Sequence, residues 1–118
     1  MRFEHFFEDG ENVYILLELC ENQTLNDLLK RRKTLHELEV AYYMRQVVEA
    51  LRYLHSQNIM HRDLKLGNLL LNKMQIKVGD FGLACQLKHF CERRKTVCGT
   101  PNYIAPEVVE LGGQECGL

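Results

Sequence analysis

The chain has 118 residues, of which 46% are hydrophobic and 26% are charged, a balance typical of a single globular domain. Its 15 Lys and Arg against 16 Asp and Glu give a formal net charge of -1 at pH 7, so neither nucleic acid nor a membrane surface is expected as a partner. Charges interrupt the apolar residues of positions 1–9, which excludes a signal peptide, and no apolar run approaches the roughly 20 residues of a membrane span.

The first predicted element is an antiparallel hairpin. Two apolar runs, Phe3–Phe7 and Val13–Leu19, flank the polar turn residues 8–12. The second run is rich in β-branched and apolar residues, which is typical of a buried strand.

A short helix is predicted next. Thr24 and Asp27 have the spacing of a capping box in front of a helix that ends near Arg32. The basic residues 30–33 suit the negative pole of that helix, and at this position they indicate a solvated face rather than a nucleic-acid site.

The longest predicted element is a helix from about residue 34 or 36 to about residue 56. Its length would be roughly 30 Å at 1.5 Å per residue. One continuous apolar face predicts that this helix runs through the core, and it consists of Val40, Met44, Val47, Leu51 and Leu54. Tyr42, Tyr43 and Tyr53 are interpreted as packing residues, because no basic groove accompanies them.

Polar residues in a fixed order follow this helix. His61-Arg62-Asp63-Leu64-Lys65 precedes Asn68, and Asp80-Phe81-Gly82 comes soon after, which is the pattern of protein kinases. Asp63 would accept the proton of the attacking hydroxyl, and Lys65 would reach the transferred phosphate. Asn68 and Asp80 would hold Mg²⁺ against the phosphates of ATP. A single such residue is more often a turn residue, but the combination is specific.

The remaining segments connect and close this pattern. Apolar residues 69–71 and 76–78 flank a polar turn at 72–75, so a hairpin is expected between the two motifs. Residues 83–95 show no period and predict a mobile loop. The segment Thr96–Glu107 ends in Ala-Pro-Glu, as a kinase activation segment does, and no structure is predicted for the tail 109–118.

Taken together, these residues resemble the polo-like serine/threonine protein kinases. The resemblance rests on Leu66-Gly67-Asn68, on Gly79 before Asp-Phe-Gly, and on residues 98–107, with further matches at positions 6–9 and 17–20. It covers about residues 3–108. The implied fold class is α+β, a partial protein-kinase-like fold made of the end of the N-lobe sheet (1–17), the hinge (18–22), the start of the helical C-lobe through the activation segment (23–108), and a divergent tail (109–118).

The resemblance also implies a nucleotide site. Leu17 would be the gatekeeper, and the backbones of Glu18 and Cys20 would hydrogen-bond adenine. Leu70 would form the floor under the adenine ring. Polo-like kinases more often have Phe at that position, so the sequence predicts apolar contact without aromatic stacking.

Substrate and regulatory residues are implied in the same way. Thr100 would steady the catalytic base and Lys65, which points to serine or threonine of a protein as the acceptor. Thr96 would be the activating phosphothreonine, Arg62 would pair with its phosphate, and Arg94 fits the basic preference of an upstream activating kinase.

Further expectations concern the surroundings of the site. His61 and Phe81 would stack in a hydrophobic column. Cys20 and Cys85 would flank the ATP site, either as reactive thiols or as small buried side chains. All five cysteines lack a Cys-x-x-Cys partner, so reduced thiols and a cytoplasmic or nuclear location are expected.

Two hypotheses about function remain open. The first is an ATP- and Mg²⁺-dependent protein kinase with a cell-cycle role, and the second is a non-catalytic, truncated kinase fragment that acts as a binding or competing module. The sequence contains no Gly-rich loop, no strand lysine with its helix glutamate, and no Asp-x-Trp element. Glu107 would lack its arginine partner. The chain alone is therefore expected to be inactive or barely stable, and to expose apolar surface.

Overall fold

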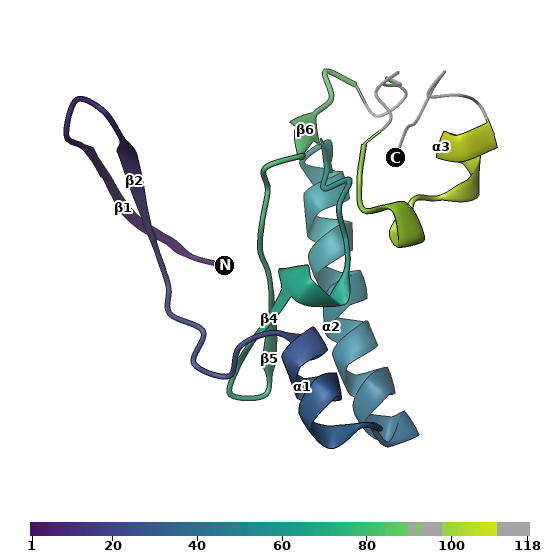
Figure 1. Cartoon of the computed structure of the whole chain (residues 1–118). Helices are drawn as coiled ribbons and strands as arrows, with labels where there is room; N and C mark the ends of the chain where they lie inside the picture. Colours follow the sequence, from purple (N-terminus) through teal and green to yellow (C-terminus); the bar gives the residue numbers. More distant parts are fainter. Residues whose placement is uncertain (90–91, 93–97, 111–118) are drawn as a thin grey trace.

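The computed structural model describes residues 1–89, 92 and 98–110. Its elements in chain order are β1 (Phe3–Glu8), β2 (Val13–Leu17), α1 (Leu25–Arg32), α2 (Glu37–Ser56), β3 (Ile59–Met60), the 3₁₀ turn η1 (Leu66–Asn68), β4 (Leu69–Asn72), β5 (Gln75–Val78), β6 (Cys85–Gln86), the 3₁₀ turn η2 (Pro101–Tyr103) and α3 (Pro106–Glu110). The β4–β5 hairpin lies against α1 and α2, and the β1–β2 hairpin projects away from this body (Figure 1). Helices beside small antiparallel sheets confirm the predicted α+β class.

The β1–β2 hairpin forms where the apolar runs predicted it. Its turn is closed by Asp9, whose side chain accepts hydrogen bonds from the backbone N–H groups of Glu11 and Asn12. The expectation of a buried second strand is wrong, because every residue of both strands is exposed, Val13 at 65% and Ile15 at 62% among them. β-Branched composition favours a strand, but burial needs a second layer, and no described element covers this one.

Both predicted helices are present with the expected starts. Thr24 and Asp27 form a reciprocal capping box at α1. At α2 the N-cap is His36, whose Nδ1 accepts from a backbone N–H while Glu39 bonds back to the His36 N–H. Arg32 reaches the same Glu39 with two bonds, of 2.6 and 2.9 Å, which ties the end of α1 to the start of α2.

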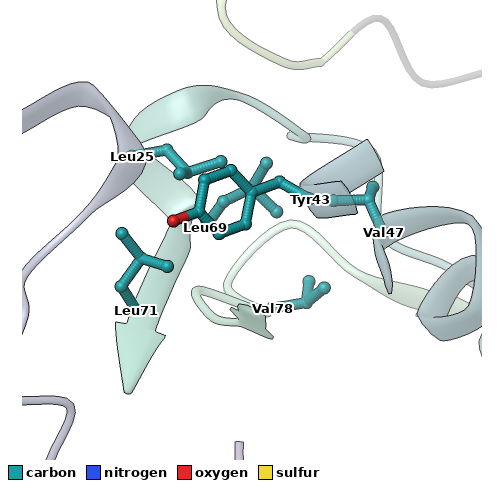
Figure 2. Packing of buried hydrophobic residues seen from close by; sticks show 6 residues of the cluster. All are labelled: Leu25, Tyr43, Val47, Leu69, Leu71 and Val78. Atoms are coloured by element: carbon teal, nitrogen blue, oxygen red, sulfur yellow. The ribbon is translucent and has the colours of Figure 1, made fainter. Parts of the chain in front are cut away.

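The core lies between the two helices and the β4–β5 hairpin. Figure 2 shows its six buried side chains, which are Leu25, Tyr43, Val47, Leu69, Leu71 and Val78. The predicted helix face is confirmed at Val47, Leu51 and Leu54, which are buried or packed against the core. It is wrong at Val40 and Met44, which are about half exposed, and only Tyr43 of the three tyrosines is buried. Val40 and Met44 instead line an open apolar pocket of about 250 Å³ between α1 and α2.

A residue in the left-handed backbone conformation connects the end of α2 to the polar motif. Asn58 has a φ of 55° and takes the role that glycine often has after a helix. The next residues form β3, which pairs with β6. The predicted loop over residues 83–95 thus contains a short strand at Cys85 and Gln86, which the sequence did not predict, while residues 90–91 and 93–95 lie outside the described part. No helix in that part is long and apolar enough to cross a membrane.

Candidate active site

His61 is buried and holds the start of the polar motif in place. Its Nε2 lies 2.9 Å from the carbonyl oxygen of Gly79, and its Nδ1 accepts from the backbone N–H of Asp63 at 3.3 Å. Those two partners require the proton to be on Nε2. The ring of Phe81 packs edge-on against His61 with the ring centroids 4.8 Å apart. One imidazole therefore links the two polar motifs.

The buried carboxylate of Asp63 accepts four side-chain or backbone donors. Its Oδ1 accepts from the backbone N–H of Thr100 at 3.0 Å and from the hydroxyl of Thr100 at 2.7 Å. Its Oδ2 accepts from Lys65 Nζ at 2.7 Å and from Asn68 Nδ2 at 3.1 Å. Lys65 also donates to the Thr100 hydroxyl oxygen at 2.8 Å. These donors use the acceptor positions of both carboxylate oxygens.

This environment lowers the pKa of Asp63 from 3.8 to about 2. The hydrogen bond from Lys65 contributes most, followed by the one from Thr100, and burial opposes both. Asp63 is consequently ionised at neutral pH.

Glycine at position 99 allows Thr100 to approach the motif. Gly99 has a φ of 123°, and an added Cβ would lie 3.0 Å from the carbonyl oxygen of Arg62. A residue with a side chain would be strained in that conformation and crowded against the backbone. The close fit of residues 98–100 onto the motif therefore depends on this glycine.

Asn68 directly precedes β4, and Asp80 lies two residues after the end of β5. Both side chains carry oxygen atoms that can bind a cation. Asn68 Nδ2 is committed to the carbonyl oxygen and carboxylate of Asp63, so its Oδ1 is the atom left to accept a cation. The backbone N–H of Gly79 donates to the Asn68 carbonyl oxygen at 2.9 Å, which places Asp80 one residue further along. Asp80 is exposed, with a φ of 56°, and its Oδ1 accepts from the Gly82 N–H. An amide oxygen and a carboxylate fit Mg²⁺, which prefers oxygen ligands.

The chain pairs with β4 where the predicted hinge (18–22) ends. The backbone of residues 22–24 pairs with β4 through Asn22 N–H to Leu71 O at 3.2 Å and Leu71 N–H to Gln23 O at 2.7 Å. Glu18 forms an ion pair with Lys77 of β5 at 3.2 Å. These contacts hold residues 18–24 against the β4–β5 hairpin.

The residues expected to contact adenine surround this junction. Leu17 is half exposed at the end of β2, and the Glu18 N–H donates to the carbonyl of Arg2. Among the described residues, the Glu18 carbonyl and the Cys20 N–H have no backbone hydrogen-bond partner. Burial raises the pKa of the Cys20 thiol, which favours the small-thiol interpretation over a reactive one.

Leu70 sits against Gly79. A Cβ added to Gly79 would lie 2.5 Å from Leu70 Cδ1, so the two residues are in direct contact. The expected adenine floor thus packs on the residue that precedes Asp80.

The structure describes Arg62 but not Thr96, the residue that is expected to be phosphorylated. Arg62 has a φ of 65°, and its Nε donates to the carbonyl oxygen of Leu83 at 2.7 Å, which fixes the segment after Phe81. Thr96 and Arg94 lie outside the described residues. The described cysteines Cys20, Cys85 and Cys98 are free thiols.

Sequence reasoning missed Gln46. Its side-chain amide bonds the turn of the β4–β5 hairpin through Met74 O at 3.1 Å and Ile76 N–H at 2.9 Å. A signal was present, because Gln46 is a polar residue that follows buried Tyr43 by three positions and adjoins buried Val47. A polar residue inside a buried face generally has a hydrogen-bond partner.

Comparison with known proteins agrees with this geometry. The model of the protein kinase domain matches residues 1–117. A probable serine/threonine-protein kinase of Zea mays, CCRP1, is 67% identical over 114 residues, which are 96% of this chain and 18% of that protein. Serine/threonine-protein kinase PLK2 of Mus musculus is 56% identical over 117 residues, 98% of this chain and 17% of that protein. Serine/threonine-protein kinase polo of Drosophila melanogaster is 51% identical over 114 residues, 96% of this chain and 20% of that protein.

The chain belongs to the protein kinase domain family. Within that family, the resemblance to polo-like serine/threonine kinases is confirmed, and the match continues past Val108, where it was expected to stop. The chain spans a fifth or less of the length of the three relatives described above.

Proposed function

We propose that this chain forms part of a polo-like catalytic domain that transfers the γ-phosphoryl group of ATP to serine or threonine residues of proteins. The observation that supports this best is the arrangement at Asp63, where Lys65 and Thr100 hold one carboxylate in a single orientation. Phosphoryl transfer needs mainly positioned charge, and this arrangement provides it.

Asp63 would accept the proton of the substrate hydroxyl. With a pKa of about 2, it is a weak base that is always ionised near neutral pH. Such a base takes the proton late, when bond formation to phosphorus has made the hydroxyl acidic. Because four donors already occupy its oxygens, a substrate hydroxyl must share or replace one of them. Lys65 would remain beside the transferred phosphate as a positive charge.

The other residues would bind the nucleotide. Asn68 and Asp80 would hold Mg²⁺, which when bound neutralises charge on the phosphates. The backbones of Glu18 and Cys20 would hydrogen-bond adenine beside Leu17, and Leu70 would contact the ring from below. The adenine assignments rest on the resemblance and on the pairing of residues 22–24, at the end of the predicted hinge, with β4.

Regulation and location follow from the same proposal. Phosphorylation of Thr96 by an upstream kinase would add a dianion that Arg62 can bind, which would order the activation segment. The free thiols and the polo-like relatives support a cytoplasmic or nuclear protein with a cell-cycle role.

A chimera tests the proposal directly. Residues 1–117 of this chain would replace the matching segment of mouse PLK2, and phosphorylation of casein would be measured with ATP and Mg²⁺. We expect activity close to that of the parent, and a loss of at least about 100-fold in the Asp63→Asn chimera, the range of general-base catalysis. Asp9→Asn makes the same change in an exposed turn and should stay within about twofold. A folded chimera in which Asp63→Asn has full activity would contradict the proposal.

A second candidate is a non-catalytic interaction module. The exposed apolar side chains of β1 and β2 favour it, because such surfaces often bind partners. The same chimera separates the two candidates, since a module would leave it folded and inactive. For the chain alone we expect no measurable phosphorylation of casein, and turnover that disappears with Asp63→Asn would contradict that expectation.

A further inference from the structure

The β4–β5 hairpin joins the two polar motifs, and Gln46 of α2 binds this hairpin close to its turn. Its Nε2 donates to the carbonyl oxygen of Met74 at 3.1 Å, and its Oε1 accepts from the backbone N–H of Ile76 at 2.9 Å. Both ends of one side-chain amide are therefore bonded to backbone groups, one at the turn residue Met74 and one at Ile76 of β5. The hydroxyl of Tyr43, one turn earlier on α2, lies 3.9 Å from Met74 Sδ.

The bond from Ile76 to Gln46 holds the start of β5, and separate contacts hold the end of β5 beside Asn68. Ile76 pairs with Leu71, and two residues later Val78 pairs with Leu69. Gly79 N–H then donates to the Asn68 carbonyl oxygen, and Asp80 follows. The segment from Ile76 to Asp80 is thus held at both ends, at Ile76 by Gln46 of α2 and at Gly79 by the carbonyl oxygen of Asn68.

The hairpin itself is too short to be rigid alone. Each of its strands has four residues, and an isolated two-stranded hairpin of that size is at best marginally stable in water. Here Leu69, Leu71 and Val78 anchor the strands in the core. Its turn is exposed at Lys73, Met74 and Gln75, so packing does not immobilise it. Among the described residues, Gln46 provides the only side-chain amide that bonds both Met74 and Ile76, on the β5 side of the turn, whereas the Lys73 N–H on the β4 side donates to Asn22 Oδ1 at 2.6 Å.

We propose that Gln46 is a positioning residue that holds Asp80 in register with Asn68 by anchoring the β4–β5 turn to α2. It touches neither nucleotide nor metal, and it acts through β5. The consequence for nucleotide affinity rests on the proposed function of Asp80, whereas the positioning itself does not.

Amide hydrogen exchange on the whole chain tests the positioning. Gln46→Met keeps the length of the side chain and removes both hydrogen bonds, while Gln46→Glu keeps the acceptor for Ile76 N–H and removes the donor to Met74. Gln57→Met is the matched control, because that exposed amide reaches only Ser56 Oγ, at 3.4 Å. The reporters are the N–H of Gly79, bonded to Asn68, and the N–H of Gly82, bonded to Asp80 Oδ1.

We expect exchange at Gly79 and Gly82 to become about tenfold faster in Gln46→Met, the effect of losing one or two ordinary hydrogen bonds. Gln46→Glu should show a smaller increase, and Gln57→Met none. The N–H of Leu87, which bonds Asn58 at 2.8 Å away from the hairpin, should not change. Equal acceleration at Leu87 would show general destabilisation, and acceleration confined to Met74 and Ile76 would show a local bond only. Either result would overturn the proposal.

A titration with ADP and Mg²⁺ then separates this inference from the proposed function. If the wild-type chain binds, Gln46→Met should weaken binding about tenfold and Gln57→Met should not. If Gln46→Met binds as tightly as wild type, Gln46 has no role in affinity. If the wild type does not bind, the proposed nucleotide site fails in this chain, and the exchange rates at Gly79 and Gly82 still decide the positioning.

Discussion

Thr100 donates two hydrogen bonds to one oxygen of Asp63, from its backbone N–H at 3.0 Å and from its hydroxyl at 2.7 Å, although 37 positions separate the two residues. The backbone bond holds Thr100 on the polar motif around Asp63 whatever the side chain at position 100 is. The hydroxyl bond adds a second effect, because it favours the ionised carboxylate.

The first prediction separates these two effects. Thr100→Val keeps the shape and the backbone donor but removes the hydroxyl, so the pKa of Asp63 should rise from about 2 toward its ordinary value of 3.8. Carbon-13 NMR titration of the Asp63 carboxyl would measure it. Thr100→Ser restores the hydroxyl and should return the pKa to the wild-type value. An unchanged pKa in Thr100→Val would mean that the Thr100 hydroxyl has no part in lowering it.

The second prediction concerns acid stability. Because the pKa of Asp63 is lower in the folded chain than in the unfolded one, its ionised form stabilises the fold. That contribution is complete above about pH 4 and disappears as the pH falls through about 2. The difference in melting temperature between wild type and Asp63→Asn should therefore narrow between pH 4 and pH 2, as followed by circular dichroism. A constant difference over that interval would show that Asp63 is not linked to folding.

Local patterns predicted the secondary structure well, because their causes lie in neighbouring residues. The capping box of Thr24 and Asp27 depends on two residues three positions apart, and the hairpin turn at 72–75 depends on polar residues between apolar runs. The order of the polar motif likewise indicated which residues meet around Asp63. Thr100 is far away in the chain, and only the family resemblance connected it to that carboxylate.

Burial was predicted less well, because it depends on what covers a surface. The residues of β2 have the composition of a buried strand, yet they are exposed, and Val40 of α2 belongs to an open pocket. The two-residue strand β6 has no pattern of its own and exists through its pairing with β3. Gln46 was overlooked for a similar reason, since its partners are backbone atoms about 30 residues away.

The third prediction tests the contact between Gly79 and Leu70. Gly79→Ala would place a methyl group 2.5 Å from Leu70 Cδ1, so the leucine side chain must move, at a cost of about 1–3 kcal/mol in the free energy of unfolding. Gly67→Ala is the control, because an added Cβ there has no neighbour within 4 Å. Thermal melts would show the difference.

A double-mutant cycle makes this test specific. Leu70→Ala removes the clashing atom, so Gly79→Ala should cost much less in the Leu70→Ala background than in wild type. Additive effects would mean that the strain at Gly79 has another source, such as the nearby Met1 side chain.

The fourth prediction concerns the exposed hairpin. Val13 and Ile15 lie two positions apart on β2, on the same face, and both are more than 60% exposed. Apolar surface on an open strand favours association with another chain, and charge on the strand opposes it. The double variant Val13→Lys, Ile15→Lys should therefore reduce concentration-dependent association in sedimentation velocity and lower the fluorescence of a bound hydrophobic dye.

Glu11→Lys is the control, because it changes the net charge by the same amount, from -1 to +1, without removing apolar surface. It should leave both measurements near the wild-type values. If Glu11→Lys suppresses association equally, net charge is the cause, and if the wild-type chain is monomeric at every concentration, the exposed strand does not drive association.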